Sequence, residues 1–240
     1  TMSQRSPRVL ALARRYGRRR MRRELDGLWV SGLEHAQAAV RAGPAIFAAT
    51  HVSWWDAFVI VAVDEALSTT THCLMDADNL ERLPFFGWIG AIPIGRGGAR
   101  ARAGLRHAAT LTKSPGEALW IFPQGRQRPA HLRPLQLEPG VRLVARLCRA
   151  PVVPVSLNYL FRESERPAAL LRFGPAITAD NFDSTVLESA LVDGLDLIDR
   201  FVDTGESTPA FSPLVPAPLA PTQDGLGARM LRWLGQRQKP

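Results

Sequence analysis

The chain has 240 residues, of which 46% are hydrophobic, and a formal net charge of +8. This length and hydrophobic content fit a single α/β domain with a sizeable core. No stretch reaches the ~18 uncharged apolar residues of a membrane-spanning helix, and no repeat of about 20–50 residues is visible, so neither a spanning helix nor a repeat architecture is expected.

The first predicted element is strongly basic. Residues 5–23 carry nine arginines and no acidic residue, with Val9, Leu10 and Leu12 among them. We expect segment 1–27 to contain a basic amphipathic helix that contacts an anionic membrane surface, where each nearby cation contributes about 1 kcal/mol. A solvated basic arm is the alternative. No nucleic-acid partner is expected, because helix-turn-helix, zinc-finger and RNP-like patterns are missing from the segment.

Apolar runs and turn residues then define the first half of the domain. Short strands are expected within 25–35 and 43–51, the second of them buried and ending at His51. Residues 55–68 are apolar on nearly every face and predict a buried helix. Residues 72–96 predict a strand, a loop and a second short apolar run.

The second half of the domain continues the alternation. An amphipathic helix is expected over 101–114, and a buried strand over 117–125 is cut short by proline. A helix over 139–150 leads into strands over 151–161 and 169–178. Alternating strands and helices predict an α/β fold with a mixed, mostly parallel sheet flanked by helices and preceded by the basic N-terminal helix.

The end of the chain is expected to be less compact. Residues 183–203 predict an acidic amphipathic helix, whereas 205–225 are rich in Pro, Ser and Thr and predict a linker or a tail on the surface. A short basic helix is expected over 226–240. We therefore expect a catalytic domain over 28–204, followed by a C-terminal segment over 205–240.

The cysteines and the N-terminus indicate the compartment. Cys73 and Cys148 lie far apart without the spacing of a zinc or redox site, so buried thiols are expected. The charged residues that follow Met2 lack the apolar core and cleavage site of a signal peptide. The predicted location is the cytoplasmic side of the membrane, as a peripheral protein.

His51 and Asp56 form the principal candidate site. A histidine can accept a proton from a hydroxyl at neutral pH if one ring nitrogen is free and the other is held, and an aspartate can hold it. Side chains five positions apart do not stack on a continuous helix, so the two can meet only if His51 lies in the turn before the helix. Alternatively, His51 ends a strand and Asp56 merely favours a helix N-terminus.

Four ordered motifs connect this pair with a known family. The segment Thr50–Asp56 matches N-H-x-S-x-x-D with threonine in place of asparagine, and Gly90–Arg96 matches G-x-I-P-I-x-R. Val153–Val155 matches V-P-V. Over residues 28–178 the chain resembles the glycerolipid acyltransferase family, the lysophosphatidate-type enzymes that transfer a fatty acyl group from acyl-CoA or acyl carrier protein to a lipid hydroxyl.

The third motif departs from the family form FPEGTRS. Its residues here are Phe122, Pro123, Gln124, Gly125, Arg126, Gln127 and Arg128. Proline and glycine predict that the turn is kept, whereas the exchange of glutamate for glutamine predicts altered polar contacts to the acceptor. A glycolipid or a glycosylated terpenoid is therefore an alternative acceptor to lysophosphatidate, with Gln124 contacting it.

The resemblance implies an O-acyltransferase in which His51, oriented by Asp56, is the general base. Arg96, the Phe122–Gly125 turn, Arg126 and Arg128 are the expected substrate-binding residues. Ser53 lies in H-x-S rather than in a G-x-S-x-G nucleophile elbow, so an esterase is not expected. The remaining alternative is a non-enzymatic basic protein that binds membranes or nucleic acid.

Other residue clusters are assigned structural roles. The aromatic residues at 54, 55, 85, 86 and 88 are expected mainly in the core. Asp76, Asp78 and Glu81 lie in one loop, where helix capping accounts for them. Neither a metal nor a cofactor is expected, since acyl-CoA or acyl carrier protein serves as donor substrate.

Overall fold

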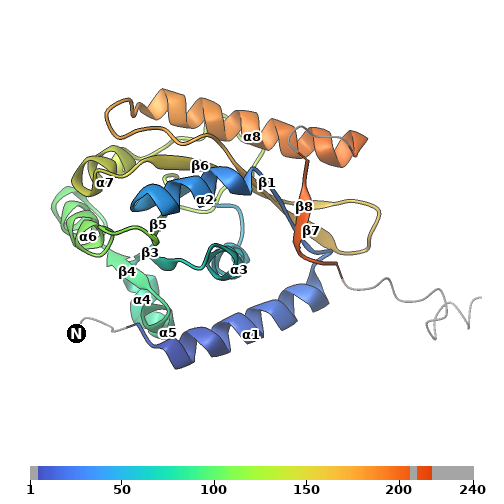
Figure 1. The fold of residues 1–240 in the computed structure, drawn as a ribbon, viewed down its shortest axis with the longest axis horizontal. Coiled ribbons are helices and arrows are strands. Elements are labelled where there is room, and N and C mark those ends of the chain that lie inside the picture. Colours follow the sequence, from blue (N-terminus) through green and yellow to red (C-terminus); the bar gives the residue numbers. More distant parts are fainter. Residues whose placement is uncertain (1–4, 206–209, 218–240) are drawn as a thin grey trace, which may run out of the picture.

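One mixed sheet forms the centre of the computed structural model, which describes residues 5–205 and 210–217. Its eight strands lie in the order β4-β3-β5-β2-β6-β7-β1-β8 (Figure 1). The strands are β1 (Leu28–Ser31), β2 (Ala45–Ala49), β3 (Thr70–Asp76), β4 (Ala91–Ile94), β5 (Glu117–Ile121), β6 (Val152–Phe161), β7 (Pro167–Phe173) and β8 (Ser212–Val215). The helices are α1 (Pro7–Glu24), α2 (Leu33–Ala42), α3 (Asp56–Leu67), α4 (Ala77–Arg82), α5 (Phe85–Trp88), α6 (Gly98–Thr110), α7 (Gly140–Cys148) and α8 (Ser184–Thr204).

Most strand pairs are parallel. The pairs β4–β3, β3–β5, β5–β2, β2–β6 and β7–β1 are parallel, whereas β6–β7 and β1–β8 are antiparallel. The prediction of an α/β fold with a mostly parallel sheet and an N-terminal helix is confirmed. The carboxyl ends of β2, β3, β4 and β5 consequently meet at one edge of the sheet, where ligand sites of such folds form.

Helices cover both faces of the sheet, which explains the continuous apolar runs of its central strands. Phe47 and Trp120 pack on the face covered by α2 and α3, while their neighbours Ile46 and Leu119 pack on the face covered by α6, α7 and α8. All five residues of β2 are buried. A strand buried on both faces has no polar alternation, as the sequence of β2 shows.

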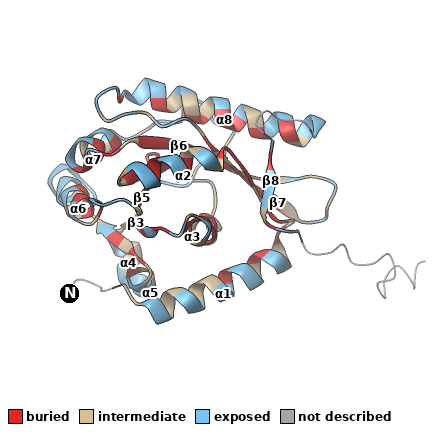
Figure 2. Cartoon of the chain, viewed as in Figure 1, coloured by how far each residue is buried: buried red, intermediate tan, exposed pale blue. Residues whose placement is uncertain are grey.

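The basic helix α1 packs along α3 (Figure 1). Its Met21 is buried in the core, and a Cβ at Gly17 would lie 3.0 Å from Cδ1 of Phe58, so glycine lets the two helices approach closely. Arg5 and Arg14 donate to the buried carboxylate of Asp64 at 3.3 and 2.8 Å. Only part of the arginine cluster therefore faces solvent, on the outer side of α1 (Figure 2).

Three local predictions need correction. The short strand expected within 25–35 is present as β1, but it ends at Ser31 and helix α2 follows, which was not predicted. The inward side chains of α2, such as Ala36 and Ala39, are too small to give a clear helical pattern. The loop within 72–96 contains the short helices α4 and α5. Part of the expected 205–225 linker forms β8, which extends the sheet by antiparallel pairing with β1, a long-range contact that composition does not indicate. The helix expected over 226–240 lies outside the described residues.

Several aromatic side chains that were expected in the core are at the surface. Trp54, Phe85 and Trp88 are 52%, 39% and 47% exposed, respectively. Trp54 precedes α3, and the other two lie on α5, beside the start of α1, where the Ser6 N–H donates to the Trp88 carbonyl at 2.8 Å. None of the helices within residues 5–205 is both long enough and apolar enough to cross a membrane.

Candidate active site

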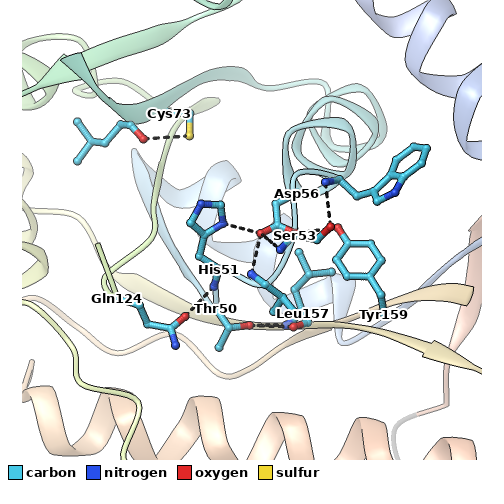
Figure 3. Close-up of polar contacts among 11 residues, drawn as sticks. Thr50, His51, Ser53, Asp56, Cys73, Gln124, Leu157 and Tyr159 are labelled. Atoms are coloured by element: carbon cyan, nitrogen blue, oxygen red, sulfur yellow. Dashed lines mark hydrogen bonds and ion pairs between the residues drawn. The ribbon is translucent and has the colours of Figure 1, made fainter. Parts of the chain in front are cut away.

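His51 lies in the turn between β2 and α3, at the carboxyl edge of the sheet (Figure 3). The apolar run of β2 brings the chain to this edge and ends at Ala49, and α3 begins at Asp56. The histidine therefore precedes the helix on which the aspartate lies. This is the arrangement under which the two side chains were predicted to meet.

The His51 ring is held by Asp56. Its Nδ1 lies 2.6 Å from Asp56 Oδ2, which also accepts from the backbone N–H groups of Val52 and Ser53 at 2.9 and 3.2 Å. Because Asp56 is only 1% exposed, its charge is directed to these donors rather than to water. The carboxylate fixes the tautomer that protonates Nδ1, which leaves Nε2 able to accept a proton. Nε2 has no hydrogen-bond partner among the described residues.

The backbone of His51 is fixed on both sides by the third-motif loop. The Gln124 side-chain oxygen accepts from the His51 N–H at 2.7 Å, and the His51 carbonyl accepts from the Arg128 N–H at 2.8 Å. The Phe122 ring stacks on the imidazole at 4.2 Å between ring centroids. The loop that follows β5 therefore positions both the backbone and the ring of the histidine.

The turn within this loop has the predicted geometry. β5 ends at Ile121, before Phe122 and Pro123, and Gly125 has a φ of +65°, which favours glycine. The Gly125 N–H donates to the Phe122 carbonyl at 3.0 Å. Gln124 is buried with its amide oxygen engaged by His51, a contact that the sequence did not indicate.

The two arginines of the loop differ in their contacts. The Arg128 guanidinium donates to the Leu135 carbonyl at 3.1 Å and to the Gln136 side chain at 2.6 Å, so it closes the loop on itself. Arg126 is exposed, and its side chain has no ion pair within the described part of the chain. Of the two, Arg126 is the one available to an anionic substrate.

Arg96 lies on the same edge of the sheet but not against His51. It follows β4, three strands from β2, which corresponds to about 14 Å at the usual strand spacing. Its Nε donates to Asp76 Oδ2 at 2.9 Å, and this hydrogen bond holds the pKa of Asp76 below its usual range. The side chain is 83% exposed. Asp76 also accepts from the Asp78 and Asn79 N–H groups, which confirms the predicted capping role for this residue of the cluster.

Two further residues of the site were not predicted. The Tyr159 hydroxyl donates to Asp56 Oδ1 at 2.8 Å. Thr50 Oγ1 donates to the Leu157 carbonyl and accepts from the Leu157 N–H, which extends the pairing of β2 with β6 beyond Ala49 (Figure 3). The alternation Val155, Leu157, Tyr159 places these side chains on one face of β6 and is the sequence signal that could have identified the tyrosine.

Two other side chains near the site, Ser53 and Cys73, could be taken for nucleophiles, but their contacts and burial do not suit that role. The Ser53 hydroxyl accepts from the Trp55 N–H at 3.2 Å, so it stabilises the turn that precedes α3. Burial and the nearby Asp56 charge raise the pKa of the Cys73 thiol to about 12, which makes it a poor nucleophile at neutral pH. In the described part of the chain, His, Cys, Asp and Glu side chains form no group of three that could hold a metal ion.

A histidine oriented by a buried carboxylate, with its outer nitrogen unpaired, is the arrangement of an enzyme that uses a general base. Residues 28–158 match the model of the acyltransferase family. The chain belongs to the acyltransferase family, and the resemblance identified from the four motifs is confirmed.

The fold agrees with a solved structure. The chain is similar to the 1-acyl-sn-glycerophosphate (LPA) acyltransferase PlsC from Thermotoga maritima, with a TM-score of 0.59 and 17% sequence identity over 79% of each chain. No significant match is found among curated protein sequences. At this identity, the likeness to PlsC concerns the fold.

Proposed function

We propose that the protein transfers a fatty acyl group from a thioester donor, acyl-CoA or acyl carrier protein, to the hydroxyl of a lysophospholipid such as lysophosphatidate. The observation that carries this proposal is the 2.6 Å contact between His51 Nδ1 and Asp56 Oδ2, which leaves Nε2 available as a base. Membership of the acyltransferase family favours this function over a non-enzymatic basic protein.

The proposed reaction needs no covalent acyl-enzyme. His51 Nε2 removes the proton of the acceptor hydroxyl while its oxygen attacks the thioester carbonyl. The resulting anionic tetrahedral species collapses with cleavage of the carbon–sulfur bond, and the imidazolium returns the proton to the leaving thiolate. Asp56 stabilises the imidazolium between these two steps.

Substrate contacts are proposed for two arginines on the carboxyl edge. The guanidinium groups of Arg126 and Arg96 are exposed, and a planar guanidinium suits the phosphate of a lysophospholipid or of CoA. Arg96 lies about three strand spacings from His51, so it suits a group remote from the reacting hydroxyl. Phe122 borders the reacting position through its stacking on His51.

The decisive experiment compares a panel of acceptor lipids. The purified protein would be incubated with labelled acyl-CoA or acyl carrier protein and with lysophosphatidate, other lysophospholipids, glycolipids or lipid alcohols. We expect lysophosphatidate to give the highest kcat/KM. A glycolipid or a glycosylated terpenoid as best acceptor would establish the alternative, and transfer to none of them would reject the proposed activity.

Replacing Gln124 with glutamate is expected to leave the order of acceptors unchanged. A carboxylate oxygen can accept the His51 N–H as the amide oxygen does, whereas Gln124→Leu removes the acceptor and should lower kcat/KM for every lipid by a similar factor. The measurement is kcat/KM across the panel for both variants. A changed order in Gln124→Glu would mean that the side chain contacts the acceptor.

We also propose that the protein docks peripherally on an anionic membrane from the cytoplasmic side. The docking surface, here called the aromatic rim, consists of Leu12, Tyr16, Trp54, Phe85 and Trp88, all at least 39% exposed. Arg20 lies over the Trp54 ring at 5.8 Å, and Tyr16 and Trp54 both contact Phe58. Aromatic side chains with nearby arginines suit the interface of an anionic bilayer, and Trp54 is three residues from His51.

The double variant Leu12→Ser/Trp54→Ser is expected to bind anionic vesicles roughly tenfold more weakly, since partial burial of two large apolar side chains contributes about 1.5 kcal/mol. The matched control is Leu147→Ser/Val186→Ser, which removes two exposed apolar side chains from α7 and α8 on the other face. Co-sedimentation with vesicles would measure both. Equal losses in the two double variants would exclude the aromatic rim as the docking surface. Deletion of α1 is a poorer test because it removes Met21 from the core.

A further inference from the structure

The carboxylate that orients His51 is shared between the turn that precedes α3 and strand β6. Asp56 Oδ2 faces the His51 ring and two backbone N–H groups, whereas Oδ1 accepts from the Tyr159 hydroxyl at 2.8 Å (Figure 3). Asp56 is almost completely buried. Every donor to this carboxylate therefore affects the negative charge that remains for the imidazole.

Tyr159 reaches Asp56 because β6 is longer than its neighbour β2. The register pairs Ala49, the last residue of β2, with Val155, and Thr50 adds contacts as far as Leu157, whereas β6 continues to Phe161 and stays paired with β7. Tyr159 lies within this overhang, on the same face as Leu157. The overhang carries the phenol past the end of β2 to the first residue of α3.

We propose, on the basis of the acyl-transfer mechanism above, that Tyr159 is a positioning residue: by donating to Asp56 Oδ1 it fixes the carboxylate and lowers the proton affinity of His51. A carboxylate that already accepts a hydrogen bond from a phenol stabilises the imidazolium less than a carboxylate without that hydrogen bond. The hydrogen bond from Tyr159 therefore favours the neutral imidazole, which is the form that acts as the base.

The surroundings allow the phenol to act as a constant donor. Burial and the adjacent Asp56 charge raise the pKa of Tyr159 well above its ordinary value, so the hydroxyl keeps its proton at all working pH values. The Cys73 thiol on β3 is neutral there too, with its pKa raised to about 12. Charged groups on the packed elements include Arg20 of α1, over the Trp54 and Trp55 rings, and Arg126 and Arg128 of the third-motif loop. They also include Asp64 of α3, paired with Arg14, and Glu138, whose N–H donates to the Pro123 carbonyl.

The test is Tyr159→Phe, which removes only the hydroxyl. We expect the titration midpoint of the His51 ring, followed by NMR in the protein without substrate, to rise by about 0.5–1 pH unit. The acidic limb of kcat/KM should move upward by the same amount, so that kcat/KM on that limb falls by about 3–10-fold. The His51→Ala variant identifies the resonance among the five histidines.

Ser156→Ala is the matched control. It also removes one buried hydroxyl from β6, but this hydroxyl donates to the Leu191 carbonyl of α8, on the other face of the sheet. We expect it to lower stability without moving the His51 midpoint. An equal midpoint in wild type and Tyr159→Phe, or an equal shift in both variants, would overturn the proposed role.

A second variant covers the case in which Tyr159→Phe does not fold. In a Tyr16→Phe background, 3-fluorotyrosine enters only position 159, because the chain has two tyrosines. The more acidic phenol donates more strongly, so the His51 midpoint should fall, and no movement would overturn the proposal. The NMR titration does not need turnover. If the wild-type protein showed no acyl transfer but the variants showed the predicted midpoint changes, only the acyl-transfer function would be rejected.

Discussion

Replacing His51 with alanine is expected to lower kcat/KM for acyl transfer by about 10²–10⁴-fold, the usual contribution of a positioned general base. The fold should persist, because the contacts of Gln124 and Arg128 are with the His51 backbone, which alanine retains. Turnover and thermal melting of the same preparation measure both effects. Activity near wild type in this variant would contradict the mechanism.

Asp56→Asn should be nearly as damaging, for a different reason. An asparagine amide can donate to His51 Nδ1, which would favour the tautomer with the proton on Nε2, the atom that must accept it. The expected loss is again about 10²–10⁴-fold. A pH profile of kcat/KM helps to separate the two variants. Raising the pH should not restore activity in His51→Ala, because that variant has no imidazole to deprotonate. Unchanged activity in Asp56→Asn would show that the carboxylate does not select the tautomer.

Replacing Asp64 with alanine is expected to lower the free energy of unfolding by about 3 kcal/mol. The Asp64 side chain is 3% exposed and accepts from Arg5, Arg14 and the Thr69 hydroxyl. Its loss removes the acceptor of both guanidinium groups, whereas the Thr69 hydroxyl keeps the Thr71 hydroxyl at 3.0 Å. Both arginine side chains are partly exposed, so they can form hydrogen bonds with water instead. The expected loss of unfolding free energy is therefore at the lower end of the range for breaking a buried ion pair.

The neighbouring residue supplies the control for this stability prediction. Glu65 accepts from Arg18 at 2.8 Å between the same two helices, but these side chains are 33% and 48% exposed. Glu65→Ala should therefore cost about 0–1 kcal/mol. Denaturant unfolding of both variants measures the difference. Equal losses would mean that burial does not distinguish these two links between α1 and α3.

Sequence periodicity was sufficient for the central elements of the fold. The run Ala45–Ala49 and the alternation of strands with helices predicted the parallel sheet, because strands buried on both faces must be apolar throughout. Helix geometry required His51 to lie in the turn before the helix if it was to meet Asp56. The choice of His51 and Asp56 as the candidate pair depended on the four motifs that the chain shares with the acyltransferase family.

Contacts between distant segments could not be predicted in the same way. The Gln124 and Tyr159 contacts join residues 73 and 103 positions apart, and they depend on strand order and on the overhang of β6. Trp54 was expected in the core because a large aromatic side chain is usually buried there. Its exposure depends on where α1 lies, which the composition of α1 does not specify.

The double attachment of His51 to the third-motif loop has a consequence for changes in chain length. Residues 124 and 128 contact the N–H and the carbonyl of the same residue, His51, so an inserted or deleted residue between them would move one contact out of register with the other. The β6–β7 connection at 162–166 carries no such constraint, since it joins two antiparallel strands at the far end of the overhang. Natural variation in length should therefore concentrate in that hairpin, while the segment from 122 to 128 should keep its length even where its residue types change.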